Sequence, residues 1–488
     1  MGEEKRVDTP LILIILLGGA ALITPLIEIF LKGDTRGRVS GYIAIAVLTL
    51  SLLLIIYPAI TTPLELTESS SSLFRNDLMG LFFSFSVLTV TLLVATSSLD
   101  YFKGEPNEPV FYSLLLFTSL GMSLLAFSVD LIMIVVAWEL MSIPTYILTG
   151  FRKKDSKSNE AALKYFILGA LSTGTILYGV SLIYGITGST NLYQIGEVLG
   201  TLTPGLYPVA LLSMLLFTAG LGLKMSIVPF HMWIPDAYEG APTVVSALLS
   251  AGTKKAAFAV AIRLFVVALP ILVLDWQITF AFLALITMTF GNISALTQKS
   301  ITRLLAYSSI AQGGYILIGL AIAMQTELGL IGLLFHVFTH AVMQTGAFIA
   351  AAAVSKKMGS VDLKSFNGLG LRMPITAFTL TICLLALAGV PPLNGFWSKL
   401  VLLTAAVDSD FVWLAVAGAL NSAFSLGYYA WIIKRMYLDE PEIKSKLHES
   451  SVFNTVLIIA VLIIIITGLY PAPIYEFARL AVSAMGIF

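Results

Sequence analysis

The chain has 488 residues and is poor in cysteine and in charge. Its single cysteine, Cys383, excludes an intrachain disulfide, a CxxC site and an iron-sulfur cluster ligated by this chain alone. The 28 basic residues balance the 28 acidic ones, so no excess of either sign indicates binding to nucleic acid. Charged residues make up only 11% of the chain, whereas soluble domains carry about 25%. The composition therefore excludes an ordinary soluble domain.

Long apolar stretches fill most of the sequence. Hydrophobic residues make up 58% of the chain, and the mean hydropathy is +0.93. A membrane span needs about 20 apolar residues. We count 14 such stretches, centred near residues 20, 50, 88, 118, 139, 173, 218, 255, 283, 314, 342, 390, 424 and 463. The chain is thus predicted to be an all-α polytopic membrane protein with about 14 transmembrane helices and no extramembrane domain.

The basic residues of the connections predict the orientation. If successive connections alternate sides, 18 Lys and Arg residues lie on one side and four on the other. Cytoplasmic loops carry the excess of positive charge, so the richer side is predicted to be cytoplasmic. An even number of spans then places both termini on the non-cytoplasmic side. The first apolar run lacks a small-residue cleavage site, so we expect it to be retained as a span.

Ionisable residues lie inside several of the predicted spans. Glu139, Lys224, Lys254 and Lys399 each fall near the centre of a span. A charge at that depth costs about 3 kcal/mol even on insertion scales, so such residues usually serve a function. We interpret the four as a pathway for ions; structural ion pairs are the alternative. Lys255 follows Lys254 and points about 100° away, so it is expected to face a different helix or a water pocket.

Three other charged residues lie nearer to span ends. Lys164 follows Glu160 by four residues at the start of the sixth span, which suits either an i,i+4 ion pair or a secondary role in proton transfer. Arg263 and Glu28 lie close to the ends of their spans. For these two we expect the side chain to extend along the helix so that the charge reaches water.

His336 and His340 are separated by one helical turn and share one face. A haem iron takes axial ligands from opposite sides of the ring, which one helix cannot supply. A metal site would need a carboxylate or a thiol nearby, and none is near in sequence. The remaining alternatives are a hydrogen-bonded core role and a proton relay. We prefer the relay because imidazole titrates near neutral pH.

Two spans contain helix-breaking residues beside a lysine. LGLKMSIVPFHMWIP places Lys224 ahead of Pro229, and LALAGVPPLNGFWSKL places Pro391 and Pro392 ahead of Lys399. Unwound backbone in a membrane is tolerated only where it is buried in protein or lines water. The two breaks are five spans apart, which predicts two five-helix repeats that are inverted because five is odd.

These patterns predict four regions. Residues 1–109 would form three helices, residues 110–268 the first repeat with a broken seventh helix, and residues 269–437 the second repeat with a broken twelfth helix. Residues 438–488 would form a loop and the last transmembrane helix.

Five segments resemble the antiporter-like subunits of respiratory complex I and its relatives, a superfamily that includes Mrp-type antiporters. They are WELMSIPTYILTGF, EAALKYFILGALSTGTILYG, KMSIVPFHMWIPDAYEGAPTVVSALLSAGTKKAAFA, QKSITRLLAYSSIAQGGYILIGL and LALAGVPPLNGFWSKL, and they cover most of residues 110–435. The resemblance is closest to the N type, although FHVFTHAVMQTGAF is more similar to the L type. It implies that Glu139 and Lys224 form the carboxylate and lysine pair, that Lys254 is the central lysine and that Lys399 is the lysine of the second broken helix.

The resemblance also implies a function. The chain would be a non-redox, proton-translocating subunit of a dehydrogenase that passes electrons from a reduced cofactor to a membrane quinone or methanophenazine. Flavin and iron-sulfur clusters would lie in other subunits, with no cofactor or metal in this chain. Expected partners are M-type and K-type neighbours, an H-type subunit further away, and the lipid of the cytoplasmic or energy-coupling membrane. NADH, a deazaflavin and ferredoxin remain possible electron donors.

The expected proton route starts in the cytoplasm. Protons would load Lys254 around the first broken helix, pass His336 and His340, and leave through Lys399. Contact between Glu139 and Lys224 would act as an electrostatic switch, since charges about 6.5 Å apart attract by about 2.5 kcal/mol at an effective dielectric constant of about 20. Two alternatives remain, a cation/proton antiporter without a redox partner and a non-catalytic membrane scaffold.

Overall fold

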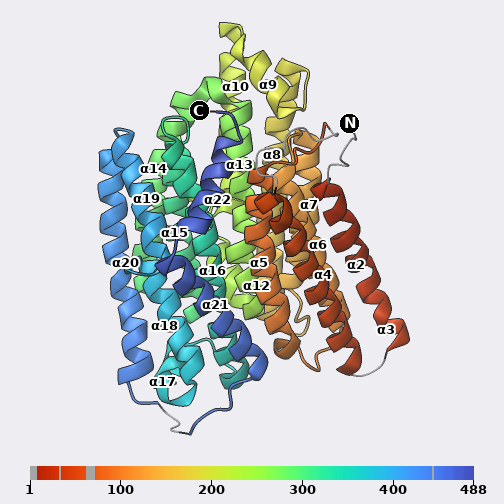
Figure 1. Cartoon of the computed structure of the whole chain (residues 1–488), viewed down its shortest axis with the longest axis vertical. Coiled ribbons are helices and arrows are strands. Elements are labelled where there is room, and N and C mark those ends of the chain that lie inside the picture. The colour runs from red at the N-terminus through yellow and green to blue at the C-terminus, as the bar shows by residue number, and fades with distance from the viewer. Residues whose placement is uncertain (1–7, 32–33, 62–71, 442–444, 488) are drawn as a thin grey trace.

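A computed structural model describes residues 8–31, 34–61, 72–441 and 445–487. Over these ranges the backbone folds into helices joined by short loops, and β-structure is limited to isolated bridges. In the same ranges, 11 helical segments are long and apolar enough to cross a membrane. They run roughly side by side in one bundle (Figure 1). The predicted all-α polytopic fold is confirmed.

The N-terminal helices are α1 (Thr9–Leu13), η1 (Ile14–Gly18), α2 (Gly19–Ile23), η2 (Thr24–Leu26), α3 (Ile27–Phe30), α4 (Asp34–Thr61), α5 (Leu78–Tyr101) and α6 (Glu108–Phe127). Of these, the stretch from α1 to α4 forms one edge of the bundle, and α5 and α6 are mostly buried inside it. The stretch from α1 to α3 exposes large apolar side chains such as Leu22 and Ile29. Exposed apolar residues on a helix of this length are typical of a surface that faces lipid.

The middle of the chain contains the first broken helix. The elements of this part of the chain are α7 (Leu131–Thr149), α8 (Ser156–Thr187), α9 (Leu192–Gly200), η3 (Pro204–Leu206), α10 (Tyr207–Met225), α11 (Ile234–Gly240), α12 (Thr243–Leu248), η4 (Leu249–Thr253), α13 (Lys254–Ile262) and η5 (Arg263–Ala268). The η4 segment is a π-helical turn. Such turns shift the register of the side chains that follow and are frequent at functional sites.

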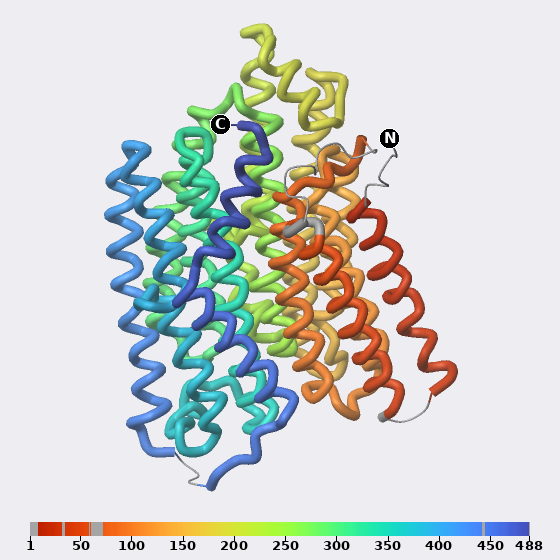
Figure 2. The backbone as a smooth tube through the Cα atoms, viewed as in Figure 1, coloured from red at the N-terminus to blue at the C-terminus, as the bar shows by residue number. Residues whose placement is uncertain are grey.

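The C-terminal half forms the rest of the bundle. Its elements are η6 (Pro270–Leu272), α14 (Val273–Leu296), α15 (Ile301–Ala321), α16 (Glu327–Met358), η7 (Leu363–Phe366), α17 (Leu369–Arg372), α18 (Pro374–Ala388), α19 (Asn394–Asp408), α20 (Val412–Leu438), α21 (Ser451–Leu469) and α22 (Ala472–Ser483). The chain reaches the edge opposite its first helices at α20, and then α21 and α22 return across the bundle (Figure 2).

Both predicted helix breaks are present. The first half-helix, α10, ends where Ser226 adopts a left-handed backbone, and Pro229 follows without an N–H to donate. The second, α18, ends at Gly389, which is also left-handed, with φ of 86°. A glycine suits this position because it has no Cβ to clash. The sequence prediction of two broken helices is confirmed at both positions.

A third break, between α21 and α22, was not predicted. Pro471 follows Tyr470 and stops α21 one residue earlier, at Leu469. Just before the break, the carbonyl of Gly468 accepts a hydrogen bond from Trp397 Nε1 at 2.7 Å. The third break therefore packs against the second, and an indole donor satisfies one of the carbonyls at the end of the helix.

Helix α16 lies at the centre of the bundle. It packs against α5, α15, α18, α19, α21 and α22, and its most apolar 18-residue window is entirely buried. It carries both His336 and His340, neither of which is accessible to solvent. The fold thus places the two histidines at the point where the two halves of the chain meet.

Arg263 forms a buried ion pair, so the prediction that its charge reaches water is wrong. Its side chain is only 2% exposed, and its Nη2 lies 2.7 Å from Asp77 Oδ1. Nη1 donates to Asp77 Oδ2 at 3.0 Å, and Nε donates to the carbonyl of Ala126 at 2.8 Å. This bidentate pair satisfies the guanidinium inside the protein. The position of Arg263 near the end of its span therefore did not predict whether its charge reaches water.

We expect Asp77→Asn to destabilise the folded subunit by about 3 to 5 kcal/mol, because it leaves the buried Arg263 without a counter-charge. Asparagine can still cap the first turn of α5, so the loss of stability would come from the missing charge and not from a missing cap. Thermal unfolding in detergent measures this loss of stability. Combining Asp77→Asn with Arg263→Met should recover much of the loss. A single variant as stable as the parent would contradict the role of this pair.

Candidate functional site

Lys224 lies in the last turn of α10, directly before the first break. Its side chain is buried, and Nζ donates to Ser142 Oγ at 3.0 Å and to Tyr165 Oη at 2.6 Å. Nζ also lies 4.7 Å from the ring centre of Tyr165 and 5.4 Å from that of Tyr146. Hydroxyl oxygens, ring faces and the carbonyl end of the helix all stabilise a cation here.

Glu139 lies on α7 and is half-buried. Its Oε1 accepts a hydrogen bond from Thr173 Oγ1 of α8 at 2.5 Å. Over the described residues the structure shows no direct ion pair between Glu139 and Lys224. Instead, Lys224 binds Ser142, which lies three residues after Glu139 and therefore on the same helix face. Lys224 therefore contacts the face of α7 that carries Glu139, and the two side chains have separate hydrogen-bond partners.

Lys254 and Lys255 are both fully buried and point to different helices, as predicted. Lys254 Nζ donates to the carbonyl and the Oγ of Ser309 on α15, each at 2.8 Å. Ser250 Oγ donates to the same Ser309 Oγ at 2.8 Å. Lys255 Nζ is hydrogen-bonded to His340 Nδ1 on α16. Lys255, assigned a secondary role from the sequence, is thus the direct contact between α13 and the histidines.

His336 is connected to Lys399 through Gln312 of α15. His336 is hydrogen-bonded through Nδ1 to Ser398 Oγ at 2.9 Å and through Nε2 to Gln312 Oε1 at 3.1 Å. Gln312 Nε2 donates to the carbonyl of Leu387 at 2.9 Å. Lys399 Nζ donates to the same carbonyl at 2.7 Å. A short network therefore connects the imidazole to the ammonium group.

The two break-associated lysines sit in the same kind of environment although they are on opposite sides of their breaks. Lys224 precedes the first break, whereas Lys399 follows the second. Lys399 nevertheless reaches back, because Nζ donates to the carbonyls of Leu387 and Ala388 at the end of α18. Both ammonium groups lie at the carbonyl end of a half-helix, where unpaired C=O groups and the helix dipole favour positive charge.

The histidines complete a row of polar groups through the interior. The rings of His336 and His340 have their centres 6.1 Å apart and are inclined by 23°. The row, which we call the interior row, consists of Lys254, Lys255, His340, His336, Gln312 and Lys399. Every member is buried. Five of the predicted site residues, Lys254, Lys255, His336, His340 and Lys399, are therefore brought into one region by α13, α15, α16 and α19.

Gly313 allows the first break to approach the interior row. A Cβ at this position would lie 3.3 Å from the carbonyl of Met225 and 3.9 Å from Lys254 Nζ. Met225 is the last residue of α10 and follows Lys224. The absence of a side chain at Gly313 thus lets the carbonyl end of α10 lie close to Lys254.

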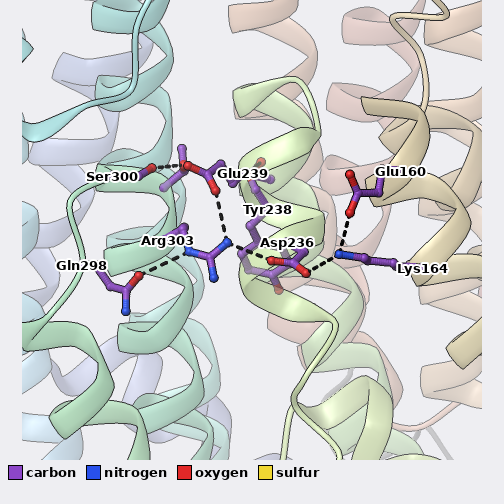
Figure 3. Close-up of polar contacts among 10 residues, drawn as sticks. Glu160, Lys164, Asp236, Tyr238, Glu239, Gln298, Ser300 and Arg303 are labelled. Atoms are coloured by element: carbon purple, nitrogen blue, oxygen red, sulfur yellow. Dashed lines mark hydrogen bonds and ion pairs between the residues drawn. The ribbon is translucent and has the colours of Figure 1, made fainter. Parts of the chain in front are cut away.

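Lys164 lies outside the interior row, in an ionic cluster with Glu160, Asp236, Glu239 and Arg303 (Figure 3). Its Nζ lies 2.7 Å from Glu160 Oε1, which confirms the i,i+4 pair, and 2.8 Å from Asp236 Oδ2. Arg303 Nη1 lies 2.8 Å from Asp236 Oδ1 and 3.1 Å from Glu239 Oε2. The cluster joins α8, α11 and α15. A role for Lys164 in proton transfer stays a prediction.

The sequence interpretation missed the neutral partners of these charges. Ser309, Gln312 and Gly313 all come from SSIAQGG, residues 308–314 within the tenth predicted span. Polar and small residues gathered in an otherwise apolar stretch are a signal that could have found them. No group of three or more His, Cys, Asp or Glu side chains that could hold a metal gathers within the described parts of the chain.

A helical membrane bundle with broken helices and buried lysines along its interior defines the class of antiporter-like membrane proteins. Residues 128–425 match the family model described as "NADH:quinone oxidoreductase/Mrp antiporter, TM". The chain belongs to this family.

Relatives and solved structures agree with this assignment. The chain is 44% identical over 419 residues to "F(420)H(2) dehydrogenase subunit N" of Methanosarcina mazei, covering 84% of each chain. It is 38% identical to "NADH-quinone oxidoreductase subunit N" of Trichlorobacter lovleyi, covering 98% of this chain and 97% of the relative. A chain of the membrane-bound sulfane sulfur reductase, described as an archaeal respiratory membrane complex, superposes with a TM-score of 0.86 at 27% identity, with 98% of each chain covered.

Proposed function

We propose that the chain is the N-type, proton-translocating subunit of a complex I-like dehydrogenase. The observation that carries the proposal is the interior row, in which buried lysines and histidines follow one another across the bundle. Relatives named subunit N belong to two kinds of dehydrogenase. Because the same type of subunit serves both, we place the electron donor site, the flavin and the iron-sulfur clusters in other subunits.

The proposal includes 14 membrane crossings. Besides the 11 long apolar segments of the described chain, we assign crossings to the interrupted stretch from α12 to η5, to α18 with α19, and to α20. The segment from α1 to α3 starts at the end of the bundle where α22 finishes (Figure 1). This arrangement supports an even number of crossings and termini on one side, which the distribution of basic residues makes the non-cytoplasmic side.

Matching details support the inverted repeats at residues 110–268 and 269–437. Isolated bridges join Asp130 to Asn191 in the first and Ser300 to Asp362 in the second. In each repeat the bridge connects the start of the second helix to the loop after the third. The third helices, α8 and α16, have 32 residues each and end at a left-handed glycine. The short helices after these loops, α9 and α17, lie at opposite ends of the bundle (Figure 1).

Protons would travel along the interior row. Lys254 would be loaded from the cytoplasmic side around α11, and Lys255, His340 and His336 would pass the proton to Lys399 for release on the other side. A positive charge on Lys224 would disfavour a proton on Lys254 by like-charge repulsion. Two like charges about 8 Å apart repel by about 2 kcal/mol at an effective dielectric constant of about 20, and a repulsion of that size changes a proton equilibrium more than tenfold.

The expected partners follow from the same assignment. The solved relative belongs to a respiratory membrane complex, which supports assembly with other membrane subunits. We place M-type and K-type subunits beside this chain, an H-type subunit further away, and the whole in the cytoplasmic or energy-coupling membrane. Glu139 is half-buried on α7, so a neighbouring subunit or lipid would cover it.

A cation/proton antiporter without a redox partner is the second candidate, because the family model covers both types. It would use the same residues but would transport in vesicles without an electron donor. Transport that depends on a sodium gradient and not on the donor would favour this candidate. Donor-driven proton uptake without sodium would favour the dehydrogenase subunit.

We expect Glu139→Gln to lower donor-driven proton uptake by about tenfold, since glutamine keeps the hydrogen bond to Thr173 but removes the charge that Lys224 would sense. The measurement is proton uptake by vesicles containing the intact complex, with donor oxidation followed at the same time. Glu197→Gln, the same change at an exposed site on α9, is the control. Uptake at the wild-type rate in Glu139→Gln would refute the role.

A further inference from the structure

Helix α11 carries a buried tyrosine between two acidic residues. Asp236 and Glu239 belong to the ionic cluster of Figure 3, with side chains 36% and 30% exposed. Tyr238, between them in sequence, is only 1% exposed, and its Oη has no hydrogen-bond partner among the described residues. Burying a hydroxyl without a hydrogen-bond partner is unfavourable, so its presence needs a reason.

The surroundings hold the ring of Tyr238 in place. Its centre lies 5.8 Å from that of Phe348 and 6.1 Å from that of Trp233, both in edge-on geometry. The Tyr238 carbonyl accepts a hydrogen bond from Ser246 Oγ at 2.7 Å, which ties α11 to α12. Packing on both sides therefore holds the ring, and with it the unpaired hydroxyl, in one position.

A line of hydroxyl groups leads from Tyr238 to Lys254. The side chain of Ser250 lies within reach of Tyr238 Oη, although the two do not form a hydrogen bond in this conformation. Ser250 Oγ donates to Ser309 Oγ at 2.8 Å, and Lys254 Nζ donates to the same oxygen at 2.8 Å. Ser250 lies in the π-helical turn, whose altered register points its side chain at α15.

We propose that Tyr238, Ser250 and Ser309 form the relay that passes a proton from the cytoplasmic end of α11 to Lys254. This inference rests on the proposed function and assigns residues to the step in which Lys254 receives its proton. Asp236 and Glu239 line an open pocket at that end together with Glu160, Lys157 and Lys164, and water in this pocket would bring protons to α11.

The relay moves protons without leaving any group charged on the way. A hydronium ion at the cytoplasmic end gives a proton to a lone pair of Tyr238 Oη, and the tyrosine releases its own proton to Ser250 Oγ. Ser250 releases its proton to Ser309 Oγ, and Ser309 releases its proton to the neutral amine of Lys254. Each hydroxyl ends with one proton, one water molecule remains at the start, and Lys254 becomes an ammonium ion.

Tyr238→Phe in the intact complex tests the relay. It keeps the ring and its packing but removes the hydroxyl, so donor-driven proton uptake in vesicles should fall by about tenfold. The amount of assembled complex should not fall, because the lost hydroxyl has no hydrogen bond to lose. Tyr112→Phe is the matched control: its hydroxyl, on α6, is also buried and without a hydrogen-bond partner. Uptake at the wild-type rate in Tyr238→Phe would overturn the relay.

A second measurement separates a relay from a packing effect. Tyr238 and Ser250 act in series, so Ser250→Ala combined with Tyr238→Phe should be no slower than the slower single variant. If the reductions in proton uptake of the two single variants multiply in the double variant, the substitutions have independent structural effects and the relay is overturned. If Tyr238→Phe pumps normally but Lys254→Met does not, the relay is wrong and the proposed function stands. If Lys254→Met also pumps normally, the proposed function itself fails.

Discussion

Lys254→Met is expected to abolish donor-driven proton uptake, to below about a tenth of the wild-type rate, while the subunit still folds and assembles. Methionine nearly matches the length of lysine but cannot carry a proton. Lys254 is fully buried, and its ammonium group binds only Ser309 among the described residues. Replacing a buried charge by an apolar group of similar volume is often neutral or stabilising. The loss would therefore report proton transfer and not folding.

The measurement combines proton uptake in vesicles with the amount of complex that co-purifies. Lys153→Met makes the same chemical change at an exposed site in the loop before α8, and it should pump normally. A non-catalytic scaffold predicts the opposite pattern for Lys254→Met, with poor assembly but undiminished uptake in the complex that forms. That pattern would end the assignment of Lys254 to the proton path.

Lys399→Arg should assemble as well as wild type but pump no better than Lys399→Met. Arginine keeps the positive charge and the donors that the carbonyls of Leu387 and Ala388 need at the end of α18. A guanidinium does not release its proton in proteins, so it can cap the helix but cannot pass a proton on. The arginine variant thus separates the structural role of Lys399 from its role in transfer.

The two variants should differ in stability even though both fail to pump. Lys399→Met removes donors from two buried carbonyls and from Ser422, which costs about 1 to 3 kcal/mol. Thermal unfolding and proton uptake are measured on the same preparations. If arginine restores uptake to the wild-type rate, Lys399 is a helix cap and not a proton carrier.

Features that depend on local chemistry were predictable from the sequence. Both breaks with adjacent lysines were found because proline and glycine disrupt a helix wherever they occur. Glu139, Lys224, Lys254 and Lys399 were found because a charge deep in an apolar stretch is costly in any fold. The break between α21 and α22 was missed although Pro471 is visible in the sequence, since it lies near the end of the last apolar run.

The residues that the buried charges bind were not predictable from the sequence in the same way. Arg263 was expected to reach water, but Asp77 meets it from 186 positions away. Lys255 was ranked below Lys254, yet it is Lys255 that binds His340. Ser309 drew no attention because a hydroxyl in a membrane helix can bond to its own backbone and costs little there. Its contact with Lys254 depends on how α13 and α15 pack.

The sequence by itself determined that the chain is embedded in a membrane, where two of its helices break beside a lysine and which charges lie near the middle of an apolar span, because apolar length and helix-breaking residues act locally. Only the tertiary structure decided which groups those charges touch. A lysine side chain reaches whatever donor or acceptor the neighbouring helix presents, and that depends on crossing, register and turns such as the π-helical one before Lys254. The order of residues in the interior row therefore comes from packing between helices and not from any single segment.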